Sequence, residues 1–216
     1  MTTTSTTTTP HVLGDLVARG TTANVATVVA GTGLLAAAAQ LTVPLWPVPI
    51  TGQTFAVLVL GAALGTRRAA AATSLYLVAG TVGLPVFTGG ASGNPFAMPS
   101  GGYLVGFVVA AALVGFLAER GWDRTPLRSL AAFGLGSAAM YAVALPWLAI
   151  SLTHLGAPHS PAAVLGAGLV PFLVGDALKA LLAAGLLPLT WRLTWRLVPR
   201  RPRRAHQGRR TSGPSA

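Results

Sequence analysis

The chain of 216 residues alternates long apolar stretches with short polar connections. The stretches lie at about Ala23–Val43, Ile50–Leu64, Ala69–Leu84, Gly101–Ala118, Ser129–Leu152 and Ala162–Leu189. A helix that spans a bilayer needs about 20 predominantly apolar residues. The second and third stretches are shorter than this, so we expect their ends to run into the flanking connections. The pattern predicts an all-α integral membrane protein with six transmembrane helices.

Composition supports the membrane assignment. Hydrophobic residues make up 52% of the chain and charged residues only 9%, whereas soluble domains carry about 25% charged residues. A water-soluble globular fold is therefore excluded. We divide the chain into a polar N-terminal segment (1–22), a six-helix membrane domain (23–190) and an Arg-rich cytoplasmic tail (191–216), which we expect to be disordered.

The basic residues are distributed unevenly between the connections. Arginines lie in the N-terminal segment, in the connections 65–68 and 119–128, and eight times in the tail, whereas connections 44–49, 85–100 and 153–161 hold no Lys, Arg, Asp or Glu. Positive residues accumulate on the cytoplasmic side of membrane proteins. The pattern predicts a multi-pass protein of the cell membrane with both termini in the cytoplasm. The same placement argues against nucleic acid as the reason for the net charge of +11.

The sequence offers little material for catalysis or metal binding. It contains no Cys, no G-K-[ST] phosphate loop, no H-E-x-x-H and no G-x-S-x-G. His154 and His159 stand in a connection without a nearby acid, so they do not suggest a metal site. We predict that the chain is not an enzyme, holds no metal and uses no cofactor.

Asp176 and Lys179 are the only charged residues inside an apolar stretch. Each charge costs about 2.5–3.5 kcal/mol at the centre of a membrane helix on insertion scales. Their spacing places them on one face of a helix, where they can pair. Two interpretations remain open: a buried ion pair that fixes helix packing, and a binding site for a polar ligand, which intramembrane charges favour.

Two uncharged segments complete the candidate site. Residues 84–103 form a long connection rich in Gly and Pro, typical of a lid or a binding loop, or else a passive extracellular connection. The segment PVPITGQ (47–53) forms an extended turn because of its prolines. Its Gln53 contacts either a neighbouring helix or a ligand. The candidate ligand contacts are Gln53, Phe87, Gly89, Gly90, Asn94 and Tyr103.

Four strings in this order resemble the BioY family. They are PVPIT with the following Gln53, GLPVF-x-GG (83–90), GGYL-x-GF (101–107) and D-x-x-K (176–179). The resemblance covers about residues 22–190 and implies a six-helix substrate-binding S component of an energy-coupling-factor (ECF) transporter for biotin. It assigns ligand binding to Asp176 and Lys179, and to the segments 87–90 and 101–103. Thr88, Gly52 and Met98-Pro99-Ser100 depart from the residues common in the family.

The resemblance also implies a mechanism and partners. Asp176 would accept hydrogen bonds from the ureido N–H groups of biotin, and Lys179 would meet the valerate carboxylate or Asp176. Two cytoplasmic ATPases would supply energy through a membrane coupling subunit, which fits the missing phosphate loop. Ala26 and Ala30 are four residues apart and predict either close packing within this chain or the docking surface for that subunit. An S component for another vitamin, or a biotin transporter that acts without partners, remains the alternative.

Overall fold

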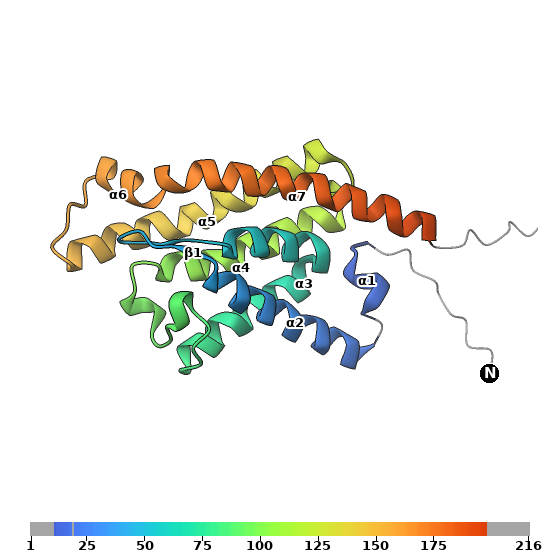
Figure 1. Ribbon diagram of the computed structural model, residues 1–216, viewed down its shortest axis with the longest axis horizontal. Helices are drawn as coiled ribbons and strands as arrows, with labels where there is room; N and C mark the ends of the chain where they lie inside the picture. The colour runs from blue at the N-terminus through green and yellow to red at the C-terminus, as the bar shows by residue number, and fades with distance from the viewer. Residues whose placement is uncertain (1–10, 19, 198–216) are drawn as a thin grey trace, which may run out of the picture.

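The computed structural model describes residues 11–18 and 20–197 and is mostly helical (Figure 1). Arg19, residues 1–10 and residues 198–216 lie outside the described residues, so the prediction of a disordered tail stays a prediction there. Residues 191–197, which we assigned to that tail, instead continue the last helix. The elements, in chain order, are α1 (Gly14–Val17), α2 (Thr21–Gln40), β1 (Thr42–Val43), β2 (Ile50–Thr51), α3 (Gln53–Thr81), η1 (Thr88–Gly90), η2 (Pro95–Ala97), α4 (Gly101–Glu119), η3 (Trp122–Arg124), α5 (Pro126–His154), α6 (Pro161–Gly168) and α7 (Val170–Leu197).

Helix α3 reverses its direction at Gly65. This glycine has φ 79° and ψ 176°, a non-helical conformation. Nε2 of Gln53 lies 2.9 Å from the hydroxyl of Tyr76, although 23 residues of uninterrupted helix would separate the two by about 35 Å. Therefore α3 consists of two antiparallel arms, 53–64 and 66–81, which correspond to the second and third apolar stretches.

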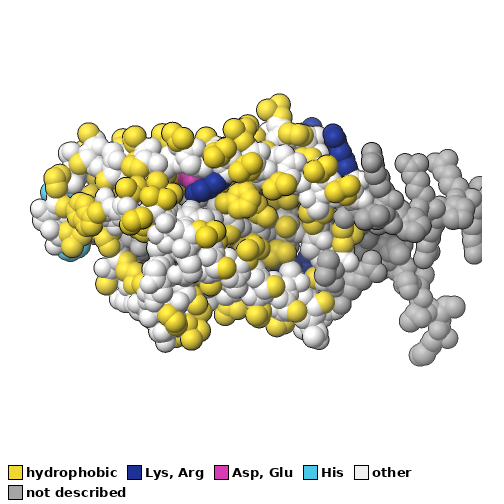
Figure 2. All heavy atoms as spheres, viewed as in Figure 1, with side chains coloured by type: hydrophobic (Ala, Val, Ile, Leu, Met, Phe, Trp, Pro, Cys, Tyr) yellow, Lys and Arg dark blue, Asp and Glu magenta, His cyan; other side chains and the backbone are white. Residues whose placement is uncertain are grey.

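Five described helical stretches are long and apolar enough to cross a membrane. They are Thr21–Gln40, Gln53–Thr81, Gly101–Glu119, Pro126–His154 and Pro161–Leu193. The second of them contains both arms of α3. The membrane character predicted from the sequence is confirmed at this level, and hydrophobic side chains are spread over the whole visible face (Figure 2). Val174 on α7, for example, is 81% exposed.

The helices run roughly along one long axis (Figure 1). Helix α4 packs mainly against α3 and α5, and α7 packs against α5 and α3. The short helix α1 and the C-terminal end of α7 lie at one end of the molecule, whereas β1, β2, α6 and connection 85–100 lie at the opposite end (Figure 1). Small residues allow this close packing: a Cβ atom added to Gly115 of α4 would lie 2.5 Å from the backbone of Gly65.

Charged contacts fix the end that carries α1. Arg68 on α3 contacts Oδ1 of Asp15 at 2.7 Å and donates to Oδ1 of Asn24 at 2.8 Å. Burial by itself would raise the pKa of Asp15, but hydrogen bonds from Arg68 and the neighbouring backbone amides hold it below its ordinary value. The backbone N–H of Thr66 donates to Glu119 at 2.8 Å. These contacts hold α1, α2 and α4 against the reversal in α3.

The fold differs from the predicted pattern in two places. Connection 44–49 is flanked by a short antiparallel ribbon, in which Thr42 pairs with Thr51 and Val43 with Ile50, so the chain is not entirely helical. The sixth apolar stretch is interrupted at Leu169, between α6 and α7, where φ is −123° and ψ is −58°. Both irregularities lie beside the cavity described below.

The reversal in α3 predicts an effect on stability. Gly65→Ala places a Cβ atom 2.7 Å from Oε1 of Glu119 in a conformation that favours glycine, so we expect it to lower the free energy of unfolding by about 1–3 kcal/mol. Unfolding of the purified protein in detergent measures this loss. The matched control is Gly33→Ala on an exposed helical position with open space around it, which we expect to be neutral or stabilising. Equal effects of the two changes would contradict the assigned role of Gly65.

Candidate functional site

A cavity lies between the helices near the end of the molecule that carries the β-ribbon. Its volume is about 80 Å³, and the free space between its lining atoms, with the open mouth included, is about 630 Å³. Most of its lining is apolar. The lining residues are Val48, Pro49, Thr51, Gln53, Thr54, Phe87, Thr88, Ala91, Met98, Ser100, Tyr103, Leu104, Phe107, Met140, Phe172 and Lys179.

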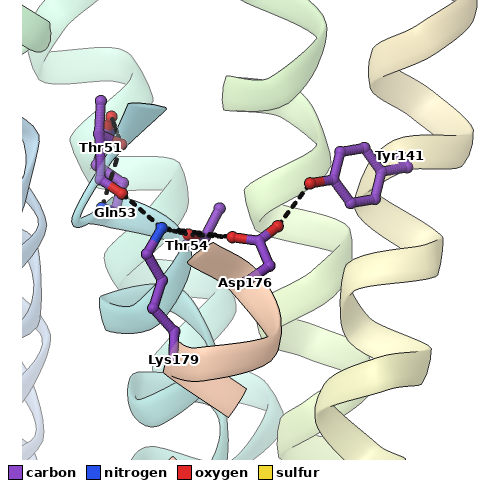
Figure 3. Close-up of polar contacts among 6 residues, drawn as sticks. All are labelled: Thr51, Gln53, Thr54, Tyr141, Asp176 and Lys179. Atoms are coloured by element: carbon purple, nitrogen blue, oxygen red, sulfur yellow. Dashed lines mark hydrogen bonds and ion pairs between the residues drawn. The ribbon is translucent and has the colours of Figure 1, made fainter. Parts of the chain in front are cut away.

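One polar chain crosses the bundle at the edge of this cavity (Figure 3). Nζ of Lys179 on α7 donates to the backbone oxygen of Thr51 at 2.8 Å, to the hydroxyl of Thr54 at 2.7 Å and to Oδ1 of Asp176 at 3.3 Å. The Thr54 hydroxyl donates to Oδ1 of Asp176 at 3.1 Å, and the Tyr141 hydroxyl donates to Oδ2 at 2.5 Å. This series of hydrogen bonds joins the start of α3 to α7 and α5.

The geometry explains how two charges are accommodated in an apolar bundle. Asp176 is 8% exposed, and a buried carboxylate requires hydrogen-bond donors to offset its desolvation. It receives donors from three side chains, Thr54, Tyr141 and Lys179. Lys179 lines the cavity whereas Asp176 lies outside its lining. The pair predicted from the sequence is therefore formed, and it meets the cavity through Lys179 and Thr54.

Gln53 forms a second polar group on the cavity wall. It is 3% exposed. Its Oε1 accepts from the hydroxyls of Thr51 and Thr88 at 3.1 and 3.3 Å, and its Nε2 donates to Tyr76. The Tyr76 hydroxyl in turn donates to the backbone oxygen of Val86 at 3.1 Å. Gln53 therefore connects the start of α3 both to the other arm of α3 and to connection 85–100.

Phe87 and Tyr103 are the other predicted site residues that line the cavity. The ring of Phe87 packs edge-on against Tyr76 with centroids 5.5 Å apart. The Tyr103 hydroxyl donates to the backbone oxygen of Gly168 at 2.5 Å, beside the interruption between α6 and α7. The Tyr103 hydroxyl thus holds the backbone at this interruption, and its ring contributes to the cavity wall.

Gly89, Gly90 and Asn94 lie outside the lining of the cavity. Gly89 and Gly90 form the turn η1 with positive φ values of 67° and 75°, so they shape connection 85–100. The Asn94 side chain accepts from the backbone N–H of Phe96 at 2.9 Å and caps η2. Their assignment as ligand contacts stays a prediction.

Sequence reasoning missed Thr54 and Tyr141, and it also missed Phe107, Met140 and Phe172 of the lining. Tyr141 is a hydroxyl-bearing residue within a long apolar stretch, and buried tyrosines usually find a hydrogen-bond partner, so it carried a weak signal. Thr54 follows the segment 47–53 that was singled out. Among the described residues, no group of three or more His, Cys, Asp and Glu side chains could hold a metal ion.

Comparisons with known proteins give the chain its family. The model of the BioY family matches residues 5–196. The chain is 38% identical over 146 residues to "Biotin transporter BioY" of Rhizobium etli, covering 64% of this chain and 75% of the relative. It is 32% identical over 154 residues to "Biotin transporter BioY" of Thermotoga maritima, covering 71% and 86% respectively.

A solved structure supports the fold. The crystal structure of the S component for biotin from an ECF-type ABC transporter superposes with a TM-score of 0.68 at 24% identity, covering 78% of this chain and 90% of that one. These findings confirm the resemblance, and with it the predictions that the chain is not an enzyme and uses no cofactor. The chain belongs to the BioY family.

Proposed function

We propose that this membrane protein is the S component of a biotin uptake transporter and captures biotin from outside the cell. The observation that carries the proposal is the cavity with the Lys179–Thr54–Asp176–Tyr141 chain at its edge. The choice of biotin as the ligand rests on the relatives that are named biotin transporters. An S component for another vitamin is the nearest alternative, and competition binding with other vitamins distinguishes the two.

The chemistry of the cavity suits the chemistry of biotin. Biotin combines a ureido ring, which has two N–H donors and a carbonyl, with a thioether ring and a valerate carboxylate. The polar edge held by the Asp176–Lys179 pair faces the polar groups of biotin, and it meets the cavity through Lys179 and Thr54. Phe87, Phe107 and Phe172 supply apolar surface for the thioether ring and the valerate chain. Mostly apolar walls with a few convergent polar groups are typical of small-molecule sites.

We further propose six transmembrane spans with both termini in the cytoplasm. The antiparallel arms of α3 support six spans because they turn one long helix into two passes. The Arg-bearing connections support the orientation, since Arg67 and Arg68 follow the reversal and Arg120, Arg124 and Arg128 follow α4. In this orientation the cavity lies toward the outer face, where it can receive biotin.

We also propose that an ATP-driven coupling module of one membrane subunit and two cytoplasmic ATPases drives transport. The exposed groove on α2 supports a docking surface for the membrane subunit. Ala26 and Ala30 are exposed, and with Thr21, Thr22, Val25 and Val29 they line that groove. Small side chains let helices approach closely in a membrane. The alternative is a transporter that acts without partners.

Substitution of the ion pair tests the ligand site. In Asp176→Asn and in Lys179→Met one charge remains without its partner, so we expect biotin affinity to fall at least about tenfold, or about 1.4 kcal/mol. Calorimetry on the purified wild type and variants, supported by tritiated-biotin binding, measures the loss. The matched control is Asp15→Asn, which removes a charge-paired carboxylate from the opposite end of the molecule. Wild-type affinity in both site variants would remove the pair from the binding site.

The absence of cysteine from the sequence permits a clean test of the topology. We expect Ser92→Cys, in exposed connection 85–100, to react with a membrane-impermeant maleimide on intact cells. Thr125→Cys, in exposed connection 119–128, should react only after the membrane is permeabilised. The opposite labelling pattern would reverse the orientation, and labelling of both positions from outside would contradict the number of spans.

Enlarging the α2 groove residues separates docking from binding. We expect Ala26→Leu combined with Ala30→Leu to reduce biotin uptake by cells severalfold while the purified protein keeps its biotin affinity. The matched control is Ala131→Leu with Ala138→Leu, the same change at exposed positions of α5. Unchanged uptake in the α2 variant would reject the docking surface, and uptake reduced equally in both variants would show a general effect of bulk.

A further inference from the structure

The hydrogen-bond directions at the polar edge of the cavity can be assigned from the chemistry of Lys179. An ammonium group has three donors and no acceptor. Three acceptors lie within reach of Nζ: the backbone oxygen of Thr51, the hydroxyl of Thr54 and Oδ1 of Asp176. The three contacts account for all of its hydrogens.

The direction of the Thr54 hydroxyl follows from this assignment. Because Lys179 can only donate, Oγ1 of Thr54 must accept from it. The Thr54 proton is then directed to Oδ1 of Asp176 at 3.1 Å. The hydroxyl thus accepts from the cation and donates to the anion, and a hydroxyl held in this way has one lone pair remaining.

Thr54 also lies where a ligand can reach it. Thr54 and Lys179 line the cavity, whereas Asp176 lies outside the lining. The three donors of Lys179 are all used in these hydrogen bonds. The polar edge therefore offers a ligand acceptor lone pairs on Thr54 and on the backbone oxygen of Thr51. A ligand group that meets this edge without displacing a bond is therefore an N–H or O–H donor.

We propose that Thr54 is a further ligand-binding residue of this site and accepts a hydrogen bond from an N–H donor of the ligand. The proposal rests on the proposed function, in which the ligand is biotin with its ureido N–H groups. The Lys179 and Asp176 contacts orient the hydroxyl, so the ion pair acts on the ligand partly through Thr54. Thr54 thereby determines specificity for a donor group at this edge of the cavity.

Two substitutions at one position test the proposal. Thr54→Val keeps the shape of the side chain and removes the hydroxyl, so we expect biotin affinity in calorimetry to fall about tenfold. Thr54→Ser keeps the hydroxyl, and its affinity should stay within about twofold of wild type. Thr81→Val is the matched control, because the Thr81 hydroxyl is exposed and bonds only to its own helix among the described residues; its affinity should equal that of wild type.

Two further measurements separate ligand binding from a structural role. If Thr54 acts together with the ion pair, the double variant Thr54→Val with Asp176→Asn should bind about as weakly as Asp176→Asn alone, since groups of one network are not additive. Thr54→Val should weaken biotin and biotin methyl ester by the same factor, because the ester changes only the carboxylate.

The outcomes distinguish this inference from the proposed function. Wild-type affinity in Thr54→Val, or an equal loss in Thr54→Ser, would overturn the role of the Thr54 hydroxyl while biotin binding by the wild type stands. A loss in Thr54→Val that adds fully to that of Asp176→Asn would overturn the action of the ion pair through Thr54. Failure of the wild type itself to bind biotin would overturn the proposed function and this inference with it.

Discussion

The structure depends on the need to satisfy two charges inside an apolar bundle. An unpaired charge in such surroundings costs several kcal/mol, so Asp176 and Lys179 require partners from outside their own helix. Thr51 and Thr54 at the start of α3 and Tyr141 on α5 supply them. Helix α7 contacts α3 and α5 mainly through apolar surfaces, and apolar packing has no preferred direction. These hydrogen bonds instead fix the rotation of α7 about its axis and its position along α3 and α5.

The reversal in α3 places the partners of the ion pair beside the connection that covers the cavity. Because the two arms are antiparallel, Gln53 at the start of the first arm meets Tyr76 near the end of the second. Tyr76 then bonds to Val86, and Gln53 bonds to Thr88. Residues 51–54 thus contact α7 on one side and connection 85–100 on the other, so the shape of the cavity depends on Gly65, which lies beside Val12 and Glu119 at the other end of the molecule.

The sequence predicted the parts of this arrangement that leave a local signal. Charges within apolar stretches are rare because they are costly. Asp176 and Lys179 were therefore identifiable as a candidate ion pair or ligand site without a structure. The Arg-bearing connection 65–68 separated the second apolar stretch from the third, as the two arms of α3 are separated. Thr54 and Tyr141 left little signal, since hydroxyl side chains are common in membrane helices and can bond to their own backbone, as Thr81 does. The packing of α3, α5 and α7 determines which hydroxyls bond to the ion pair. No local sequence pattern indicates this packing.

Under the proposed function, the same satisfaction of charges affects which ligands the cavity accepts. Each donor of Lys179 already has an acceptor within the chain, so a ligand group that displaces one of these bonds exchanges one hydrogen bond for another and gains little net free energy. Under the proposed function, burial of the ligand against Phe87, Phe107 and Phe172 adds apolar stabilisation to the hydrogen bonds at the polar edge. The polar edge would also reject other ligands, because a ligand that displaces a bond without replacing it leaves a buried charge unsatisfied. Under the proposed function, the ion pair that stabilises helix packing therefore also selects the ligand.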